Sequence, residues 1–168
     1  MSRRNATGGA SVSKIGWMIH SLRTGIAAAV SLAIARLFHM PEAYWAAITT
    51  LIVMQSTLGA AWKVSTRRFV GTALGAALGA LMAAHFEPRV VVFGAAIVML
   101  GIICAILRLD QTAYRFAGIT LTIVALVARG NSSYVVAVHR FLEVSIGIVV
   151  GLALTALWPQ RELVPPRN

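Results

Sequence analysis

Apolar residues fall into long runs that carry almost no charge, and polar residues collect between the runs. Five runs are about 17 to 19 residues long, and a sixth is shorter and has Arg115 near its start. The runs are Leu22–Phe38, Ala43–Ala61, Phe69–Phe86, Val90–Leu107, Tyr114–Ala128 and Phe141–Trp158. At about 1.5 Å per residue, each run approaches the length that crosses a hydrocarbon core of about 30 Å. Because that core offers no water to exposed backbone groups, runs this apolar must be helices. The pattern predicts an all-α integral membrane protein with six transmembrane helices.

Composition points to the same class of protein. The 168-residue chain is 58% hydrophobic and only 12% charged, with a mean hydropathy of +0.80, whereas about a quarter of a soluble domain is charged. A basic stretch precedes the first run, but no small-residue cleavage site with a soluble domain behind it follows, so we expect a helix and not a removed leader. The lone Cys104 leaves no partner for an intramolecular disulfide.

The placement of charge predicts how the chain is oriented. A net charge of +10 would suggest nucleic acid in a soluble protein, but here the basic residues flank the apolar runs, which is a signal of membrane topology. With the N-terminus in the cytoplasm, only Arg36, Arg89, Arg129 and Arg140 fall outside. We therefore expect both termini in the cytoplasm and no nucleic-acid partner. The predicted division is a basic N-terminal segment (1–21), a membrane domain (22–158) and a cytoplasmic tail (159–168).

The chain resembles itself when it is shifted by 72 residues. The arginine–phenylalanine pair at 68–69 falls on the pair at 140–141, and Arg36 falls on Arg108. Each copy holds three helices, and an odd number sends the second copy through the membrane from the other side. We predict an inverted 3+3 repeat with halves of about 22–89 and 90–158, a plan typical of transporters with a path between the halves. The alternative is that six similar helices reuse one packing pattern.

Glycines recur at every fourth position on one face of two predicted helices. They are Gly71, Gly75 and Gly79 in the third, and Gly147 and Gly151 in the last. In lipid, small residues let helix backbones approach closely. We expect these faces to form a helix–helix contact or a dimer seam, or to leave room for a pathway.

Charged residues inside the runs are the candidates for chemistry. Glu143 is the only acid well inside a predicted span, and it follows Arg140 by one helical turn, which allows an ion pair. Such residues usually face a bundle interior or a water-filled cavity. Glu143 is expected either to neutralise Arg140 or Arg68, or to serve as a protonatable coupling site.

Three arginines share one local pattern, because Arg68, Arg115 and Arg140 each precede a phenylalanine at the expected start of a helix. The planar guanidinium suits carboxylates, and arginines at a pore mouth select anions. The alternative is that they snorkel to lipid headgroups.

In the second helix, the polar residues Thr49, Thr50 and Gln55 would line a substrate path or hydrogen-bond across helices.

Signals for catalysis and cofactors are missing from the sequence. It has no G-x-x-x-x-G-K-[ST] phosphate loop, its histidines lack metal-ligand spacing, and no serine has a His/Asp arrangement. We expect no metal, no cofactor and no enzymatic activity.

The stretch YWAAITTLIVMQSTLGAAWKVSTRRFVGTALGAALGAL, Tyr44–Leu81, resembles the core of the fusaric acid resistance-like, or aromatic acid exporter, superfamily. Its R-x-x-G-T-x-x-G element is filled by Arg68, Gly71, Thr72 and Gly75. YRFAGITL (114–121) and RFLEVSIGIVVGLALTALWP (140–159) resemble the fifth and sixth helices of the same block, so the resemblance covers residues 22–159.

This resemblance implies export of aromatic or other carboxylic acids across a bacterial inner membrane, driven by the proton gradient. Plant relatives are dimeric organic-anion channels with arginines along the pore. By analogy, Arg68 and Arg140 would contact the anion, and Glu143 would couple protons. Many bacterial members carry two six-helix blocks and large cytoplasmic regions. A single block here favours a homodimer in the lipid bilayer. A passive organic-anion channel and a non-transporting scaffold or accessory subunit are the alternatives.

Overall fold

The computed structural model describes residues 4–87, 89–127 and 133–158, with side-chain positions from residue 16 onward. These residues form six helices and no strands, which confirms the all-α prediction. The helices are α1 (Arg4–Leu37), α2 (Tyr44–Val53), α3 (Leu58–His85), α4 (Val90–Ile106), α5 (Gln111–Val127) and α6 (Ser133–Leu157).

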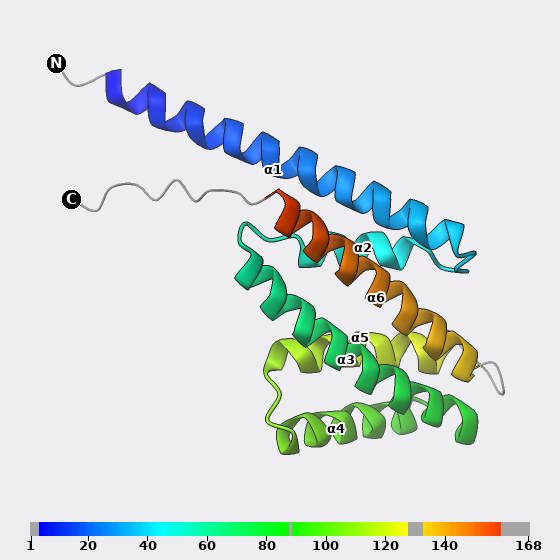
Figure 1. The fold of residues 1–168 in the computed structure, drawn as a ribbon. Coiled ribbons are helices and arrows are strands. Elements are labelled where there is room, and N and C mark those ends of the chain that lie inside the picture. The colour runs from blue at the N-terminus through cyan, green and yellow to red at the C-terminus, as the bar shows by residue number, and fades with distance from the viewer. Residues whose placement is uncertain (1–3, 88, 128–132, 159–168) are drawn as a thin grey trace.

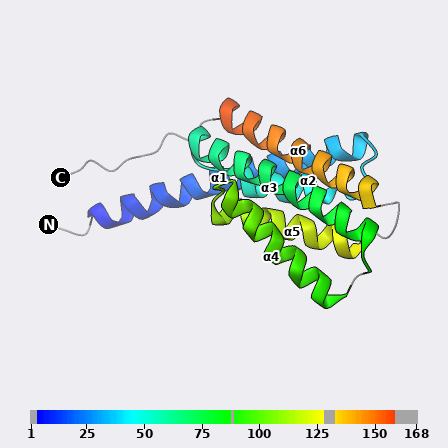
Figure 2. The same ribbon diagram turned by 90° about the horizontal axis from the view of Figure 1, so that it is seen from below.

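The helices differ in whether they could cross a membrane unaided. Two are long and apolar enough by length and composition, Gly16–Leu37 within α1 and the whole of α6. Three more, α2, α4 and α5, are apolar but only 10 to 17 residues long. The predicted division at residue 21 does not mark a structural boundary, because α1 runs through it without a break. Figure 2 shows α1 extending past the other helices at its N-terminal end.

The prediction of one helix over Ala43–Ala61 is wrong. Helix α2 ends at Val53, and Met54 adopts an extended conformation with φ −62° and ψ 106°. Thr57 then caps α3, because its side-chain oxygen accepts a hydrogen bond from the backbone N–H of Ala60. Threonine before an apolar turn is a helix-start signal, but apolar residues on both sides of the break conceal it from hydropathy.

The predicted start of the third helix near Phe69 is also wrong, because α3 already begins at Leu58. As a result, Arg68 lies inside α3 and does not open it. Arg115 and Arg140 likewise lie within α5 and α6. The three arginines therefore occupy helix interiors, where their neighbours on other helices decide what they contact.

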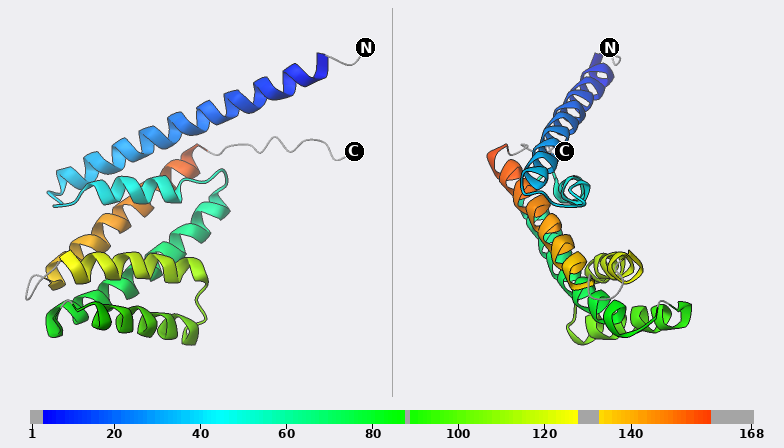
Figure 3. Two further views of the ribbon diagram at one scale, coloured as in Figure 1. Left: turned by 180° about the vertical axis from the view of Figure 1, so that it is seen from behind. Right: turned by 90° about the vertical axis from the view of Figure 1, so that its right-hand side faces the viewer.

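Helices α3 and α6 pack side by side at the centre of the molecule. Helix α5 packs on α3, α2 packs on α6, α1 covers α2 and α6, and α4 covers α5 and α3. Successive helices run in alternating directions, so that the start of α1 and the end of α6 lie at the same end of the bundle (Figure 1). Seen end-on, α2 and α5 lie on the same side of the layer that contains α1, α6 and α3 (Figure 3).

Helices α1 and α4 end in the same kind of turn. His39 and Arg108 have positive φ angles of 54° and 53°. The N–H of Met40 bonds to the carbonyl of Ala35 at 3.0 Å, and that of Leu109 bonds to the carbonyl of Cys104 at 2.9 Å. Both are Schellman turns, which satisfy the last carbonyls of a helix. Each turn reverses the chain and directs the next helix back along its predecessor.

Candidate functional site

The glycine faces bring helix backbones into direct contact. In α3, a Cβ at Gly71 or Gly75 would clash with the carbonyl oxygens of Ala113 or Ala117 in α5. In the same helix, a Cβ at Gly79 would lie 3.0 Å from the Cβ of Val124. Helix α5 is therefore held against α3 by backbone packing that no larger residue permits.

Helix α6 packs on α2 in the same manner. A Cβ at Gly147 would clash with the carbonyl of Ala46 and the side chain of Thr49, and one at Gly151 would lie 2.9 Å from Val53. Thr50 strengthens this contact, because its hydroxyl lies 3.0 Å from the carbonyl of Ala46 and 3.1 Å from that of Gly147.

The two central helices meet through their phenylalanines. The rings of Phe69 in α3 and Phe141 in α6 are 5.0 Å apart between centroids. Arg68 and Arg140 each precede one of these rings by one residue. Because each arginine is one residue away from a ring of this pair, the contact brings both arginines to about the same level of the bundle.

Arg68 is buried without an acidic partner. It is 4% exposed, its Nε donates to the hydroxyl of Thr49 at 3.1 Å, and its guanidinium lies 4.8 Å from the centroid of the Phe116 ring. Among the described residues, every ion pair involves other side chains. The arginine therefore joins α2, α3 and α5 around a positive charge that the described protein does not neutralise.

Arg140 is buried between two carboxylates. It is 2% exposed and forms an ion pair with Glu42, while its Nη1 lies 3.6 Å from Oε2 of Glu143. Its guanidinium stands 4.3 Å from the centroid of the Trp45 ring. Oε1 of Glu143 accepts a hydrogen bond of 2.9 Å from the backbone N–H of Glu42. Glu143 thus pairs with Arg140 and not with Arg68.

Glu42 is a site residue that the sequence did not reveal. It lies in the linker between α1 and α2. The sequence pattern predicts no more for an acid at this position than a solvent-exposed loop residue. The signal that was available is its place just before α2, since carboxylates favour the N-terminal ends of helices. Only the fold shows that Arg140 of α6 lies beside Glu42.

The other predicted anion contacts lie elsewhere. Thr50 serves the α2–α6 contact, and Gln55 donates its side-chain amide to the carbonyl of Ile52 at 3.0 Å. Arg115 is exposed and has no ion pair among the described residues. Among the described residues, Thr49 is the predicted contact that forms a hydrogen bond with Arg68.

Arg23 is a second buried residue whose contacts the sequence did not reveal. It is 1% exposed within α1. Its guanidinium donates to the carbonyl of Trp158 at 2.5 Å and to that of Gln55 at 2.6 Å. These carbonyls follow the last turns of α6 and α2, whose dipoles attract a positive charge. Arg23 therefore ties α1 to the ends of both helices.

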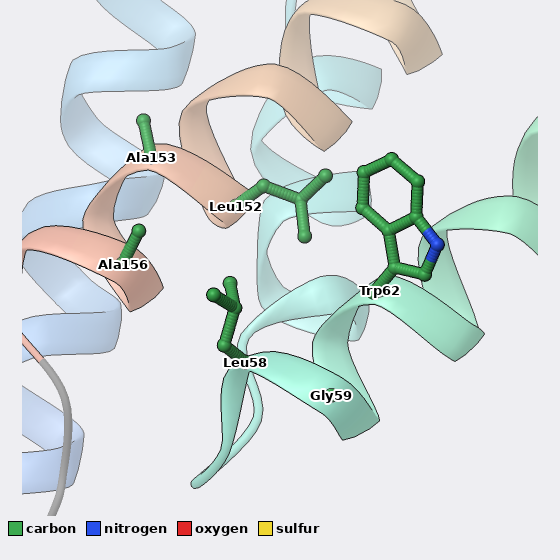
Figure 4. A pocket seen from close by; sticks show the side chains of 6 residues that line it. All are labelled: Leu58, Gly59, Trp62, Leu152, Ala153 and Ala156. Atoms are coloured by element: carbon green, nitrogen blue, oxygen red, sulfur yellow. The ribbon is translucent and has the colours of Figure 1, made fainter.

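A surface groove of about 540 Å³ lies at the same end of the bundle, between the start of α3 and the end of α6. Figure 4 shows Trp62, Leu58 and Leu152 facing one another across it. Its lining is apolar and consists of Leu58, Gly59, Trp62, Leu152, Ala153 and Ala156. None of the buried charges described above lines it.

Comparison with known proteins adds two findings. The sequence pattern of the family described as fusaric acid resistance protein-like matches residues 7–154. Inner membrane protein YeeA of Escherichia coli (strain K12) is 29% identical over an alignment of 153 residues, and the match covers 88% of this chain and 42% of that protein. The chain thus spans less than half the length of this relative. No solved structure matches.

Proposed function

Because the chain belongs to the fusaric acid resistance protein-like family, we propose that it forms a membrane domain that exports small organic anions, aromatic carboxylates in particular. The observation that carries this proposal is Arg68, a buried guanidinium without an acidic partner in the described chain. The relative from Escherichia coli is named an inner membrane protein, which supports the same location here.

The surroundings of Arg68 suit an aromatic carboxylate. A buried charge costs several kcal/mol unless it is paired, and a bound carboxylate would supply the missing partner. Its two oxygens match the planar donor fork of arginine. Phe116 lies beside the guanidinium and offers an apolar face to an aromatic ring, while Thr49 fixes the Nε end of the fork.

The frame that we propose is a six-span inverted repeat. Exchanging α1, α2 and α3 for α4, α5 and α6 maps every helix–helix contact of the described chain onto another contact or onto itself. The two Schellman turns at His39 and Arg108 correspond in the same way. The alternating helix directions in Figure 1 support the inverted relation.

We further propose that both termini are cytoplasmic, as the basic residues indicate, and that a second copy completes the assembly as a homodimer. No catalysed reaction, cofactor or metal enters the proposal. In this arrangement Arg68 lies between helices of both halves, where inverted-repeat transporters place their substrate.

A passive anion channel is the second candidate function, and the surroundings of Glu143 favour it. Its carboxylate is 1% exposed, pairs with Arg140 and accepts the N–H of Glu42. These partners in the fold account for the buried carboxylate without a role in proton transfer. Proton coupling through Glu143 therefore stays a prediction to be tested against uncoupled flux.

Uptake of benzoate into proteoliposomes, measured with and without a pH gradient, tests the proposal. Arg68→Gln is expected to lower flux at least tenfold, since leaving a bound charge without its buried partner costs about 2–5 kcal/mol. The matched control is Arg89→Gln, because Arg89 pairs with Glu87 in an ion pair whose side chains are both 75% exposed. That variant is expected to keep wild-type flux.

Glu143→Gln separates the two transport modes. Flux that follows the gradient in the wild type and loses this dependence in Glu143→Gln would establish coupled export. Flux that needs Arg68 but ignores the gradient in both proteins would establish the channel. A folded, oriented protein that carries no anion would contradict both and favour a scaffold or accessory subunit.

A further inference from the structure

The two halves build the same arrangement around their central arginines. Arg68 in α3 stands over Phe116 in α5, and Arg140 in α6 stands over Trp45 in α2. The glycine contacts correspond as well, because Gly75 lies on Ala117 where Gly147 lies on Ala46. Each arginine thus occupies the equivalent place in its half, over the ring of an equivalent helix.

The difference between the halves is the presence of carboxylates. Three residues after Arg68 stands Gly71, which packs on the carbonyl of Ala113. Three residues after Arg140 stands Glu143, which packs on the backbone of Glu42. Glycine and alanine in one half are therefore replaced by two acids in the other, and both acids turn toward Arg140.

The two acids are held in different ways. Glu143 is 1% exposed and binds the backbone N–H of Glu42. The side chain of Glu42 is 32% exposed. Because Glu143 holds the backbone of Glu42 and not its side chain, the Glu42 carboxylate can rotate away while the linker stays in place. Glu42 is thus the displaceable partner of Arg140.

Several buried hydrogen-bond donors around Arg140 have no partner while Glu42 forms its ion pair with Arg140. Nε and Nη1 of Arg140 and Nε1 of Trp45 are buried and form no hydrogen bond with the described residues. Buried donors of this kind are costly unless a ligand or water serves them. A free carboxylate with two mobile oxygens could reach donors that the tethered side chain of Glu42 does not.

We propose that Arg140 and Trp45 form a second carboxylate-binding site and that Glu42 is its built-in occupant, a role that rests on the proposed function. A free carboxylate replaces Glu42 one for one, so the charge around Arg140 does not change. The tethered group competes at a high effective concentration, of millimolar order for short linkers. The site therefore stays closed to dilute anions and opens when their concentration rises or when Glu42 is removed.

Quenching of Trp45 by 4-nitrobenzoate tests this site directly. Trp17, Trp62 and Trp158 are replaced by phenylalanine in the full chain, which leaves Trp45 as the only indole. In detergent, Glu42→Gln is expected to tighten 4-nitrobenzoate binding at Trp45 at least tenfold. Arg140→Gln added to Glu42→Gln is expected to abolish it. Glu87→Gln, which removes an exposed acid from another linker, is the matched control and is expected to leave quenching unchanged.

Several results would overturn the proposal. Equal quenching with Glu42 present or absent, in proteins of unchanged helicity, would show that Glu42 does not occupy a ligand site. Quenching that survives Arg140→Gln would place the ligand elsewhere. If Glu42→Gln fails to fold, Glu42→Asp serves instead, since its shorter side chain competes less and should still tighten binding.

The outcome is separable from that of the flux assay. If flux requires Arg68 but quenching of Trp45 is the same with and without Glu42, this proposal is contradicted and the transport proposal is supported. Quenching governed by Glu42 in a protein that carries no anion would do the reverse.

Discussion

At the scale of single residues, the same dipeptide acquires different roles through its neighbours. Arg68 and Arg140 both precede a phenylalanine, and both are buried. Arg140 pairs with Glu42, 98 residues away in the chain, and with Glu143, whereas the described residues give Arg68 a hydroxyl and a ring but no carboxylate. The charge on Arg68 therefore remains available to a ligand, and that on Arg140 does not while Glu42 holds it.

Glycine contacts give a residue-scale prediction of stability. Gly75→Ala places a methyl group against the backbone of Ala117, which cannot move aside as a flexible side chain would. We expect the free energy of unfolding to fall by about 1–3 kcal/mol, as for other overpacked sites. Reversible unfolding in mixed micelles measures it.

Gly118→Ala is the matched control for Gly75→Ala. No atom lies within 4 Å of the added methyl group, and alanine favours a helix over glycine by up to about 1 kcal/mol. This variant should therefore be as stable as the wild type or more so. Equal losses in both variants would show that the tight contact at Gly75 is not what stabilises the α3–α5 pair.

At the scale of elements, the interruption between α2 and α3 is the main departure from the expected pattern. Gln55 lies in this interruption, and its backbone carbonyl accepts from Arg23 of α1. Helix α2, with 10 residues, is about 15 Å long, which is half of a hydrocarbon core. Interrupted helices of this kind need partners for the freed backbone groups, and Arg23 supplies one.

Replacing Arg23 should loosen these helix ends. Arg23→Gln removes two hydrogen bonds from a charged donor, so we expect the free energy of unfolding to fall by about 2–3 kcal/mol. Thermal unfolding followed by circular dichroism measures the change. Arg36→Gln is the control, because Arg36 lies exposed in the last turn of the same helix. An unchanged midpoint for Arg23→Gln would show that its two carbonyl contacts contribute nothing to stability.

At the scale of the whole molecule, the helix–helix contacts of the two proposed repeat halves correspond, but the equivalent residues are not separated by one constant spacing. Arg68 and Arg140 are 72 residues apart, as are Gly75 and Gly147. The rings that they face, Phe116 and Trp45, are 71 apart, and the turns at His39 and Arg108 are 69 apart. A uniform shift of 72 therefore aligns α3 with α6 but misaligns α1 with α4, so the expected match of Arg36 with Arg108 is wrong.

An inverted repeat predicts that equivalent turns face opposite sides of the membrane. His39→Cys and Arg108→Cys, made in a Cys104→Ala background, test this with matched sites, because both residues are exposed and have the same backbone conformation. In intact cells, an impermeant maleimide should label Cys at 39 and reach Cys at 108 only after permeabilisation. Labelling of both from one side would contradict the six-span inverted arrangement.

The sequence by itself determined the elements whose cause is local. Long uncharged runs require helices in lipid, and glycines on one face mark where helices approach closely. Both properties depend only on composition and spacing along one helix. The helical character of the chain and the glycine faces of α3 and α6 therefore follow from the order of the amino acids alone.

Only the tertiary structure decided where α2 ends and which side chains share a site. The break after Val53 lies within an apolar run, and Arg23 satisfies it from another helix. Glu42 meets Arg140 because α6 packs on α2. Burial and charge pairing depend on which helices adjoin, and residues far apart along the chain set them.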